Sequence, residues 1–255
     1  MITWEERLAA LPAVSLAELE SEAALLTRVD RKYIVSPAVW ADVLASVDGL
    51  RALEIDGERA FGYASVYFDT PELESFRDAA RRRPSRYKVR TREYLDTGGR
   101  AIEVKLRSAK GETVKHREWI GADVARGRGL DAEARDFVAS FPEVGEAVDR
   151  LAPVLTTRYR RSTLVADGAR VTIDRDVVGI DTDGERIGFG GALIVETKSS
   201  LRAGDVDRAL WARGVRPSRV SKYCTTLAAL QPGLPANRWS RTLRRHLTHA
   251  AAIAA

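Results

Sequence analysis

The chain lacks several features that mark common classes of protein. It has one cysteine, Cys224, and three histidines in 255 residues. A single cysteine excludes an internal disulfide, and neither residue type shows the spacing of a metal site. No stretch of about 18 apolar residues suggests a transmembrane segment, and residues 1–11 lack the blocks of a signal peptide. We therefore expect a cytoplasmic protein in which Cys224 is a small buried residue of a helix.

Common catalytic motifs are also missing. The sequence contains no P-loop and no G-x-G-x-x-G, and no nucleophile–base set stands out. These absences argue against kinase-like or covalent catalysis. The net charge of +5 favours anionic partners without choosing among them. Because interleaved exposed aromatic residues and a basic recognition helix are missing, nucleic acid is not an expected partner.

What the chain does have is alternation of charged and apolar residues. It occurs in residues 87–94, 102–107, 113–119 and 193–199. Lys88, Arg90 and Arg92 share one parity of the first segment, and Lys115 and Arg117 share one parity of the third. Side chains alternate across a strand, so each segment predicts a strand with one charged face. A solvated face is the ordinary alternative. Because the pattern recurs on strands that hairpins should make neighbours, it favours a sheet whose charged faces line a water-filled interior. Such an interior would bind a polyanion and its divalent metal.

Periodicity and turn residues predict an antiparallel α+β domain. Strands are expected at 28–35, 63–68, 86–95, 100–107, 112–120, 155–165, 169–175, 177–181 and 191–199. Helices are expected at 4–11, 15–27, 36–47, 70–80, 131–150, 204–213 and 221–230. Hairpins rather than βαβ crossovers join the strands. The basic segment 238–249 predicts a short helix or a frayed tail, with docking to a protein or an acidic membrane surface as an alternative.

An ordered series of short motifs carries a family resemblance. The motifs are Asp30-Arg31-Lys32-Tyr33, Val66-Tyr67-Phe68-Asp69-Thr70, Tyr87-Lys88-Val89-Arg90-Thr91-Arg92, Glu103-Val104-Lys105, Lys115-His116-Arg117, Arg158-Tyr159-Arg160-Arg161, Arg170-Val171-Thr172-Ile173-Asp174, Glu196-Thr197-Lys198 and Ser221-Lys222-Tyr223. Their order resembles a VTC domain, the polyphosphate polymerase domain of the vacuolar transporter chaperone complex. That domain belongs to the triphosphate tunnel metalloenzyme superfamily.

The resemblance implies a fold and an activity. The fold would be an eight-stranded antiparallel β-barrel that forms a tunnel, with helices packed on the outside. It would occupy residues 28–231, between an N-terminal helical segment (1–27) and a basic C-terminal helix or tail (232–255). In the polymerase reaction, the end of a polyphosphate chain attacks the γ-phosphate of ATP, and ADP leaves. The implied ligands are ATP or another nucleoside triphosphate, polyphosphate or triphosphate, and Mn²⁺ or Mg²⁺.

Site residues carry over from the motifs by position. Phosphate contacts and catalysis are implied for Lys32, Arg90, Arg92, Lys105, Lys115, Arg161, Arg170 and Lys222. Further ligand contacts are implied for Tyr159, Lys198, Arg219 and Ser221. Glu196 and Glu103 are the implied metal ligands. Cross-strand ion pairs are the alternative for Glu103, Lys105, Glu196 and Lys198. Asp69 is expected to cap a helix, and Tyr67, Phe68 and Tyr223 are expected to pack. Asp174 could be a metal carboxylate or a turn residue.

One departure bears on the reaction. The hydrolytic CYTH-type branch of the superfamily carries E-x-E-x-K on its first strand, where this chain has Arg28, Asp30 and Lys32. A cation in place of the first carboxylate disfavours a two-metal site that activates water. The departure favours a polyphosphate polymerase or related phosphotransferase. A tripolyphosphatase or nucleoside triphosphatase stays open, as does a non-catalytic module that binds polyphosphate.

Overall fold

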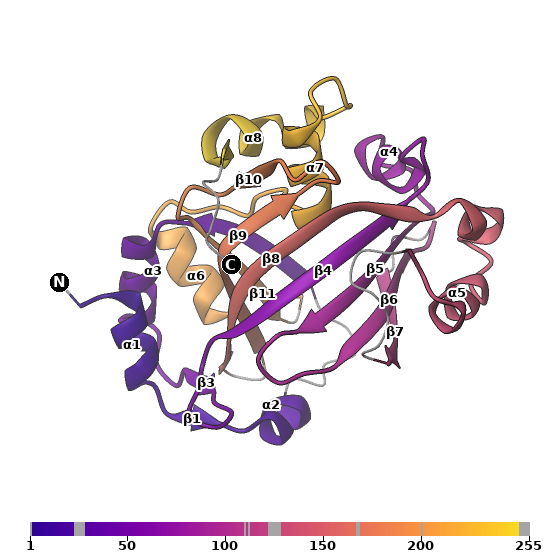
Figure 1. The fold of residues 1–255 in the computed structure, drawn as a ribbon. Helices are drawn as coiled ribbons and strands as arrows, with labels where there is room; N and C mark the ends of the chain where they lie inside the picture. Colours follow the sequence, from indigo (N-terminus) through magenta and orange to yellow (C-terminus); the bar gives the residue numbers. More distant parts are fainter. Residues whose placement is uncertain are drawn as a thin grey trace. The chain divides into compact units, whose positions relative to one another are not determined.

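A computed structural model describes residues 2–22, 29–109, 111, 113–121, 129–166, 169–199 and 201–249 (Figure 1). The chain divides into two compact units. Unit 1 comprises Met1–Phe61, Tyr159–Val177 and Phe189–Val220, and unit 2 comprises Gly62–Arg158, Val178–Gly188 and Ser221–Ala255. Two long strands, β8 and β9, contribute residues to both units. Nearly all strand pairs are antiparallel, as the α+β prediction requires; β1 with β3 is a parallel pair.

Unit 1 contains a mainly antiparallel sheet, one face of which is buried in an apolar core. Its strands, in the order of their pairing, are β2 (Val29–Val35), β11 (Leu193–Ser199), β9 (Ala169–Ile180), β8 (Ala152–Ala166), β3 (Arg51–Leu53) and β1 (Ala13–Val14). The odd-numbered Tyr33 and Val35 of β2 are buried in an apolar core with Ile173 of β9. The even-numbered Asp30 and Lys32 have the opposite parity. Period-two alternation therefore separates an apolar face from a charged one.

Three helices cover the apolar face of unit 1: α1 (Trp4–Ala10), α3 (Pro37–Leu44) and α6 (Asp205–Ala212). Helix α2 (Leu16–Glu22) belongs to the same unit. Helix α3 begins where Ser36 Oγ accepts a hydrogen bond from the backbone N–H of Val39, and Pro37 occupies the first helical position. Trp40 of α3 and Leu210 of α6 are fully buried in the core. The charged parity of β2, β9 and β11 thus lies on the side of the sheet opposite these three helices.

Unit 2 contains the three consecutive charged strands expected from the sequence. The strands that belong to it, wholly or in part, are β12 (Thr248–His249), β10 (Arg186–Gly188), the end of β9, the start of β8, β4 (Phe61–Asp69), β5 (Arg86–Tyr94), β6 (Arg100–Arg107) and β7 (Thr113–Ile120), in the order of their pairing. The helices are α4 (Glu74–Ala80), α5 (Ala132–Ala139), η1 (Gly145–Arg150), α7 (Lys222–Leu230), η2 (Asn237–Trp239) and α8 (Ser240–His246).

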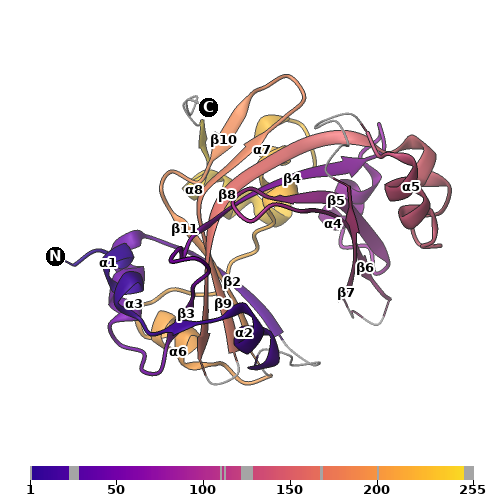
Figure 2. The ribbon, with the colours of Figure 1, turned by 60° about the horizontal axis from the view of Figure 1, so that its bottom comes forward.

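Two apolar clusters hold unit 2 together. Val89, Ile102 and Val104 of the strands are fully buried in a cluster with Val138 of α5, and Figure 2 shows α5 on the outer side of β5–β7. Elsewhere Tyr223 of α7 packs with residues of α4 and η2. Because α5 covers the apolar parity of β5 and β6, their charged parity lies on the other side of this sheet.

Several expectations about individual residues are confirmed. The buried Asp69 carboxylate accepts hydrogen bonds from the backbone N–H groups of Thr70, Ser75 and Phe76, and so caps α4. Tyr223 donates its hydroxyl to the same carboxylate at 2.5 Å and is buried. Cys224 is fully buried in α7. Burial raises the pKa of Asp69, and the four donated hydrogen bonds oppose that rise.

Other expectations need correction or fall outside the described residues. The strands expected at 169–175 and 177–181 are one strand, β9, in which Asp176 takes a left-handed φ of 54°. Helix α4 begins at Glu74, four residues after Thr70, because Thr70 Oγ1 accepts the N–H of Glu74. The short strands β1, β3 and β12 were not expected, and neither was β10 at its observed position. Residues 1, 23–28, 110, 112, 122–128, 167–168, 200 and 250–255 are not described, so Arg28 and the expected end of the helix at 15–27 lie outside the described residues.

The basic C-terminal segment forms a helix, α8, as one of the two expectations required. It is followed by β12, which pairs with β10. Docking of this segment to a partner stays a prediction. No helix among the described residues is long and apolar enough to cross a membrane.

Candidate functional site

Cationic side chains are aligned across three neighbouring strands of unit 2. The strand register places Lys88 of β5 opposite Lys105 of β6, and Lys105 opposite Lys115 of β7. We call these three residues the lysine row. Like charges directly opposite one another on a sheet destabilise it. An arrangement of three ammonium groups at adjacent positions is therefore suited to an anion that lies across the strands.

The next row of the same face centres on a buried carboxylate. Arg90 lies opposite Glu103, and Glu103 lies opposite Arg117. Glu103 is 1% exposed. Its Oε2 accepts from Arg90 Nε at 2.7 Å, and its Oε1 accepts from Arg117 Nη2 at 2.7 Å. Lys115 Nζ is 3.4 Å from Oε1, and Arg92 Nε is 3.8 Å from Oε2. Four cations thus share one carboxylate.

Electrostatics in this cluster are strongly perturbed. Burial would raise the pKa of Glu103, but the charges of Arg90, Arg92, Lys115 and Arg117 outweigh it and lower that pKa well below its usual range. Burial also lowers the pKa of Lys115 to about 8, against the pull of Glu103 and with a contribution from the neighbouring guanidinium groups. Lys115 is thus held near its titration point at neutral to mildly alkaline pH. An additional anion would favour its charged form.

Packing on aromatic rings and neighbouring hydroxyls fixes the positions of the cations. Arg90 donates to the Tyr67 hydroxyl at 2.9 Å, and its guanidinium lies 5.6 Å from the centroid of that ring. Lys88 Nζ donates to Ser221 Oγ at 3.2 Å and lies 5.8 Å from the ring of Tyr223. Ser221 is the N-cap of α7. The start of this helix therefore lies beside the lysine row.

Aromatic residues gather at one end of this charged face. The rings of Tyr63 and Tyr94 are 5.2 Å apart, and those of Tyr94 and Trp119 are 5.4 Å apart. Arg117 lies within 6 Å of both Tyr94 and Trp119. Trp119 is 58% exposed. Gly99 has a φ of +90°, and a Cβ there would lie 3.1 Å from the Trp119 ring, so glycine permits this packing. Trp119 thus presents an open aromatic surface next to the cations.

Unit 1 carries its own charged cluster. Lys32 of β2 lies opposite Glu196 of β11, and Lys198 lies opposite Asp30 and Arg170. The ammonium groups of Lys32 and Lys198 each approach one oxygen of Glu196 at 3.2 Å. Glu196 in turn raises the pKa of Lys32, against its burial. Two cations therefore share one carboxylate here as well.

A second ion pair lies on the same parity of unit 1. The fully buried Asp174 carboxylate accepts from Arg161 Nε at 2.6 Å and from Nη2 at 2.9 Å. Burial would lower the pKa of Arg161, but Asp174 raises it well above its ordinary value. The guanidinium also lies 5.3 Å from the ring of Tyr159. This two-point contact fixes the orientation of Arg161.

The structure distributes the residues that the motifs singled out over the two units. Unit 2 holds Arg90, Arg92, Glu103, Lys105, Lys115, Ser221 and Lys222. Unit 1 holds Lys32, Tyr159, Arg161, Arg170, Glu196, Lys198 and Arg219. Arg219 is exposed on a segment tied to β2 by a 2.7 Å hydrogen bond from the Ser218 N–H to the Lys32 carbonyl. Lys222 is the first residue of α7.

Four further residues belong to these clusters. Lys88 and Arg117 have the parity of the charged faces, and the strand register adds them to the lysine row and the Glu103 cluster. Asp174 orients Arg161. Thr172 lies opposite Glu196, is buried, and its Oγ1 has no hydrogen-bond partner among the described residues. A threonine within a strand gives no sequence signal of this kind, because the missing hydrogen bond is visible only in the fold.

Among the described residues, no three His, Cys, Asp or Glu side chains gather into a metal-binding group. The observed contacts of Glu103 are all with cations. Glu196 differs, because the unsatisfied hydroxyl of Thr172 lies opposite it in the sheet. One carboxylate with a neighbouring hydroxyl suits Mg²⁺, which commonly takes one or two protein carboxylates and completes its shell with water and substrate phosphates. The donor set at Glu196 therefore fits a single hard cation.

Comparison with known proteins gives a family match and fold matches. The sequence model of the VTC domain matches residues 27–231. A proposed adenylyl cyclase from Hippeastrum with a dominant triphosphatase activity has a similar fold (TM-score 0.54, 16% identity, covering 81% of this chain and 98% of that one). So does a proposed adenylate cyclase from Bacillus halodurans (TM-score 0.51, 11% identity, 76% and 94%). No curated protein matches the sequence.

The cluster around Glu103 makes a prediction about stability. We expect Glu103→Gln to lower the free energy of unfolding at neutral pH by about 3 kcal/mol, because it leaves partly buried cations without their carboxylate. The Glu103 pKa is lowered in the folded state, so its stabilisation is present above the ordinary value of 4.5 and is lost as the pH falls through the folded-state pKa. Urea unfolding of both proteins at neutral and acidic pH measures this difference.

Glu118→Gln is the matched control, because Glu118 lies on β7 with the opposite parity and is exposed. We expect this variant to unfold within about 0.5 kcal/mol of the wild type. Inorganic tripolyphosphate should restore part of the stability lost in Glu103→Gln, since it supplies the missing negative charge. Equal stability of the two variants would contradict the central role of Glu103.

Proposed function

The chain belongs to the VTC-domain family, and we propose that it is a divalent-metal-dependent phosphotransferase that moves the γ-phosphate of ATP to the end of a polyphosphate chain. The observation that carries the proposal is the lysine row, in which Lys88, Lys105 and Lys115 occupy adjacent positions on three strands. A linear polyanion offers oxygens at a similarly close spacing. Its binding would turn a repulsive row into a set of charge-assisted hydrogen bonds.

In unit 2, the proposed task is to bind and orient phosphates. The ammonium groups of the lysine row donate to phosphate oxygens as point charges, while the planar forks of Arg90 and Arg92 can engage two oxygens each. Glu103 is a positioning residue in this account, because it holds Arg90 and Arg117 by hydrogen bonds of 2.7 Å. Fixed cations require no reorganisation when charge develops on the transferred group.

In unit 1, the proposed task is to hold the metal and stabilise charge. Glu196, with Thr172 opposite it, would hold Mg²⁺ or Mn²⁺. When bound, such a cation supplies charge neutralisation at the phosphate oxygens. Lys32 and Lys198 contact Glu196 in the structure and would exchange that contact for phosphate oxygens. Arg161, held by Asp174, would donate to a phosphate from a fixed orientation.

The proposed reaction is a direct displacement at phosphorus. A terminal oxygen of the polyphosphate chain attacks the γ-phosphorus, and a new P–O bond forms. The bond between the γ-phosphorus and the β,γ-bridging oxygen breaks, so that ADP leaves with the electron pair. Such transfer depends on positioning and charge stabilisation rather than on a protein nucleophile. This requirement agrees with the cationic clusters and with the absence of a nucleophile–base motif in the sequence.

Hydrolysis is the second candidate function. The similar protein from Hippeastrum has a dominant triphosphatase activity, which favours water as an acceptor on this fold. Against it, the described residues contain no cluster of three carboxylates or other metal ligands that could hold two cations and activate a water. Arg28, the cation at the first position of the E-x-E-x-K comparison, lies outside the described residues. A module that only binds polyphosphate is the remaining alternative.

The test is to incubate the purified protein with ATP and Mg²⁺ or Mn²⁺ and to measure ADP, free phosphate and long-chain polyphosphate together. We expect ADP and polyphosphate with little free phosphate. ADP with an equal amount of free phosphate would establish the triphosphatase instead. No turnover, with thermal stabilisation by tripolyphosphate, would leave a binding module.

Replacement of the proposed metal ligand sharpens this test. We expect Glu196→Gln to reduce metal-dependent turnover by at least about a hundredfold, since the charge neutralisation supplied by the metal contributes several kcal/mol. Tripolyphosphate should still stabilise the variant in a thermal unfolding assay without metal. Glu58→Gln, an exposed residue of the same unit, is the control and should keep wild-type turnover. Unchanged turnover in Glu196→Gln would remove Glu196 from the site.

The exposed ring of Trp119 supports a nucleotide as the phosphate donor. It lies on the same parity of β7 as Lys115, at the aromatic end of the charged face. Stacking of a base on an aromatic side chain contributes about 1–3 kcal/mol. We expect Trp119→Ala to raise the KM for ATP roughly tenfold and to leave tripolyphosphate affinity unchanged. Equal weakening of both ligands, measured by turnover and by calorimetry, would show that Trp119 supports Arg117 rather than a base.

A further inference from the structure

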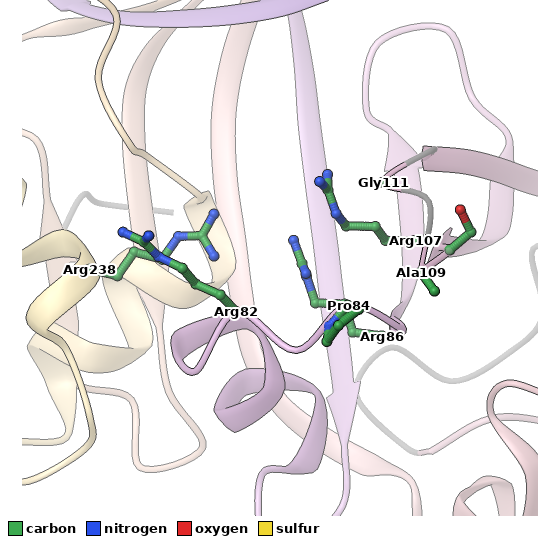
Figure 3. A pocket seen from close by; sticks show the side chains of 8 residues that line it. Arg82, Pro84, Arg86, Arg107, Ala109, Gly111 and Arg238 are labelled. Carbon is green, nitrogen blue, oxygen red and sulfur yellow. The ribbon is translucent and has the colours of Figure 1, made fainter.

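A separate pocket of unit 2 is lined by arginines. It is an open depression of about 200 Å³, lined by Arg82, Pro84, Arg86, Arg107, Ser108, Ala109, Gly111 and Arg238. Figure 3 shows the side chains of the four arginines around the pocket, with Arg86 and Arg107 extending in a similar direction and Arg82 directed towards Arg238. None of the eight lining residues is acidic or aromatic. The pocket therefore offers charge and hydrogen-bond donors but no surface on which a base could stack.

The four arginines come from separate parts of the chain. Arg86 and Arg107 are opposite one another on β5 and β6. Arg82 follows α4, with a left-handed φ of 58°. Arg238 belongs to η2 and donates to the Ala79 carbonyl at 2.8 Å. Because this bond ties Arg238 to the end of α4, the pocket is assembled by tertiary structure rather than by one basic segment.

Mutual repulsion in the pocket is appreciable. Burial lowers the pKa of Arg86, and the charges of Arg107 and Arg238 lower it further. Clustered cations destabilise a fold unless an anion offsets them. Arginine forks match the geometry of phosphate oxygens and can bind them at two points. The pocket thus has the charge and the donor geometry of a phosphate site.

The pocket continues the charged face of β5 and β6. Arg86 and Lys88 share a parity, and their partners Arg107 and Lys105 do so too. Two residues along a strand span about 7 Å. The arginine pair is therefore the next row after Lys88 and Lys105, on the side away from Glu103. Trp119 lies at the other end, since its partner Ala101 is beyond Glu103 on β6.

We propose that the arginine pocket binds a further stretch of a linear polyphosphate chain, beyond the phosphates held by the lysine row. The inference rests on the proposed function and adds the orientation of the bound chain along the charged face. The nucleoside end would lie towards Trp119, and the growing or accepting chain would extend towards Arg86 and Arg107. A short triphosphate would fill the lysine row alone. A long chain would occupy both places at once.

The experiment compares two ligands by calorimetry, inorganic tripolyphosphate and long-chain polyphosphate. We expect the double variant Arg86→Gln/Arg107→Gln to weaken binding of the long chain by about tenfold or more, since two charge-assisted contacts to phosphate oxygens are lost. Tripolyphosphate affinity should stay within about twofold of the wild type, as the lysine row is intact. Arg107→Gln alone should show the same selective loss to a smaller degree. This single variant keeps the test interpretable if the double variant does not fold.

Arg158→Gln/Arg241→Gln is the charge-matched control, because both residues are exposed and neither lines the pocket. This variant should bind both ligands like the wild type. Equal loss for the two ligands in Arg86→Gln/Arg107→Gln, or no loss for either, would overturn the proposal. If the wild type does not bind tripolyphosphate at all, the proposed function fails at the lysine row. If it binds tripolyphosphate but the arginine variants do not affect the long chain, the pocket proposal alone fails.

Discussion

Repulsion between cations fixed at neighbouring positions of a sheet is the constraint on which the rest of this structure depends. Lys88, Lys105 and Lys115 are held opposite one another by the register of β5, β6 and β7. Val89, Ile102 and Val104 have the other parity and are fully buried. A slip of one residue would expose these apolar side chains and bury the cations. The core therefore keeps the charges together, and an anionic ligand would add to the partial compensation that Glu103 gives Lys115.

Carboxylates partly offset the repulsion in both units, and they do so in a similar way. Glu103 is shared by four cations in unit 2, and Glu196 is shared by two lysines in unit 1. Asp174 performs the same task for Arg161. Such pairs hold cationic side chains in defined orientations before a ligand arrives. We infer that these carboxylates orient the cationic side chains for a ligand.

Much of this architecture could be predicted from the sequence. Period-two alternation predicted the charged faces, and the order of the short motifs predicted the VTC-domain family, which the family match confirms. The α+β fold is confirmed by the antiparallel pairing and by the similar folds of the Hippeastrum and Bacillus halodurans proteins. Individual elements such as the hairpins of β5, β6 and β7 were placed within one or two residues, because Gly98-Gly99 and Gly111 mark their turns.

What could not be predicted depends on register and tertiary contact. Parity places Lys88 on a charged face, but it does not say that Lys105 will be its neighbour rather than Glu103. The unsatisfied hydroxyl of Thr172 and the approach of Arg238 to Arg86 and Arg107 arise only when distant segments pack. The sequence predicts separate strands at 169–175 and 177–181, whereas the chain continues through Asp176 as the single strand β9. The roles of the individual site residues stay predictions.

The most direct test of the account is the pH dependence of tripolyphosphate affinity. Desolvation and the neighbouring guanidinium groups lower the pKa of Lys115 to about 8, so we expect binding of a phosphate to Lys115 above this pH to take up a proton. The dissociation constant should be flat at neutral pH and rise by up to about tenfold per pH unit above 8. Lys115→Arg, whose side chain stays charged, should remove that rise. Identical pH profiles for the wild type and Lys115→Arg would contradict the assignment of the lysine row as the phosphate site.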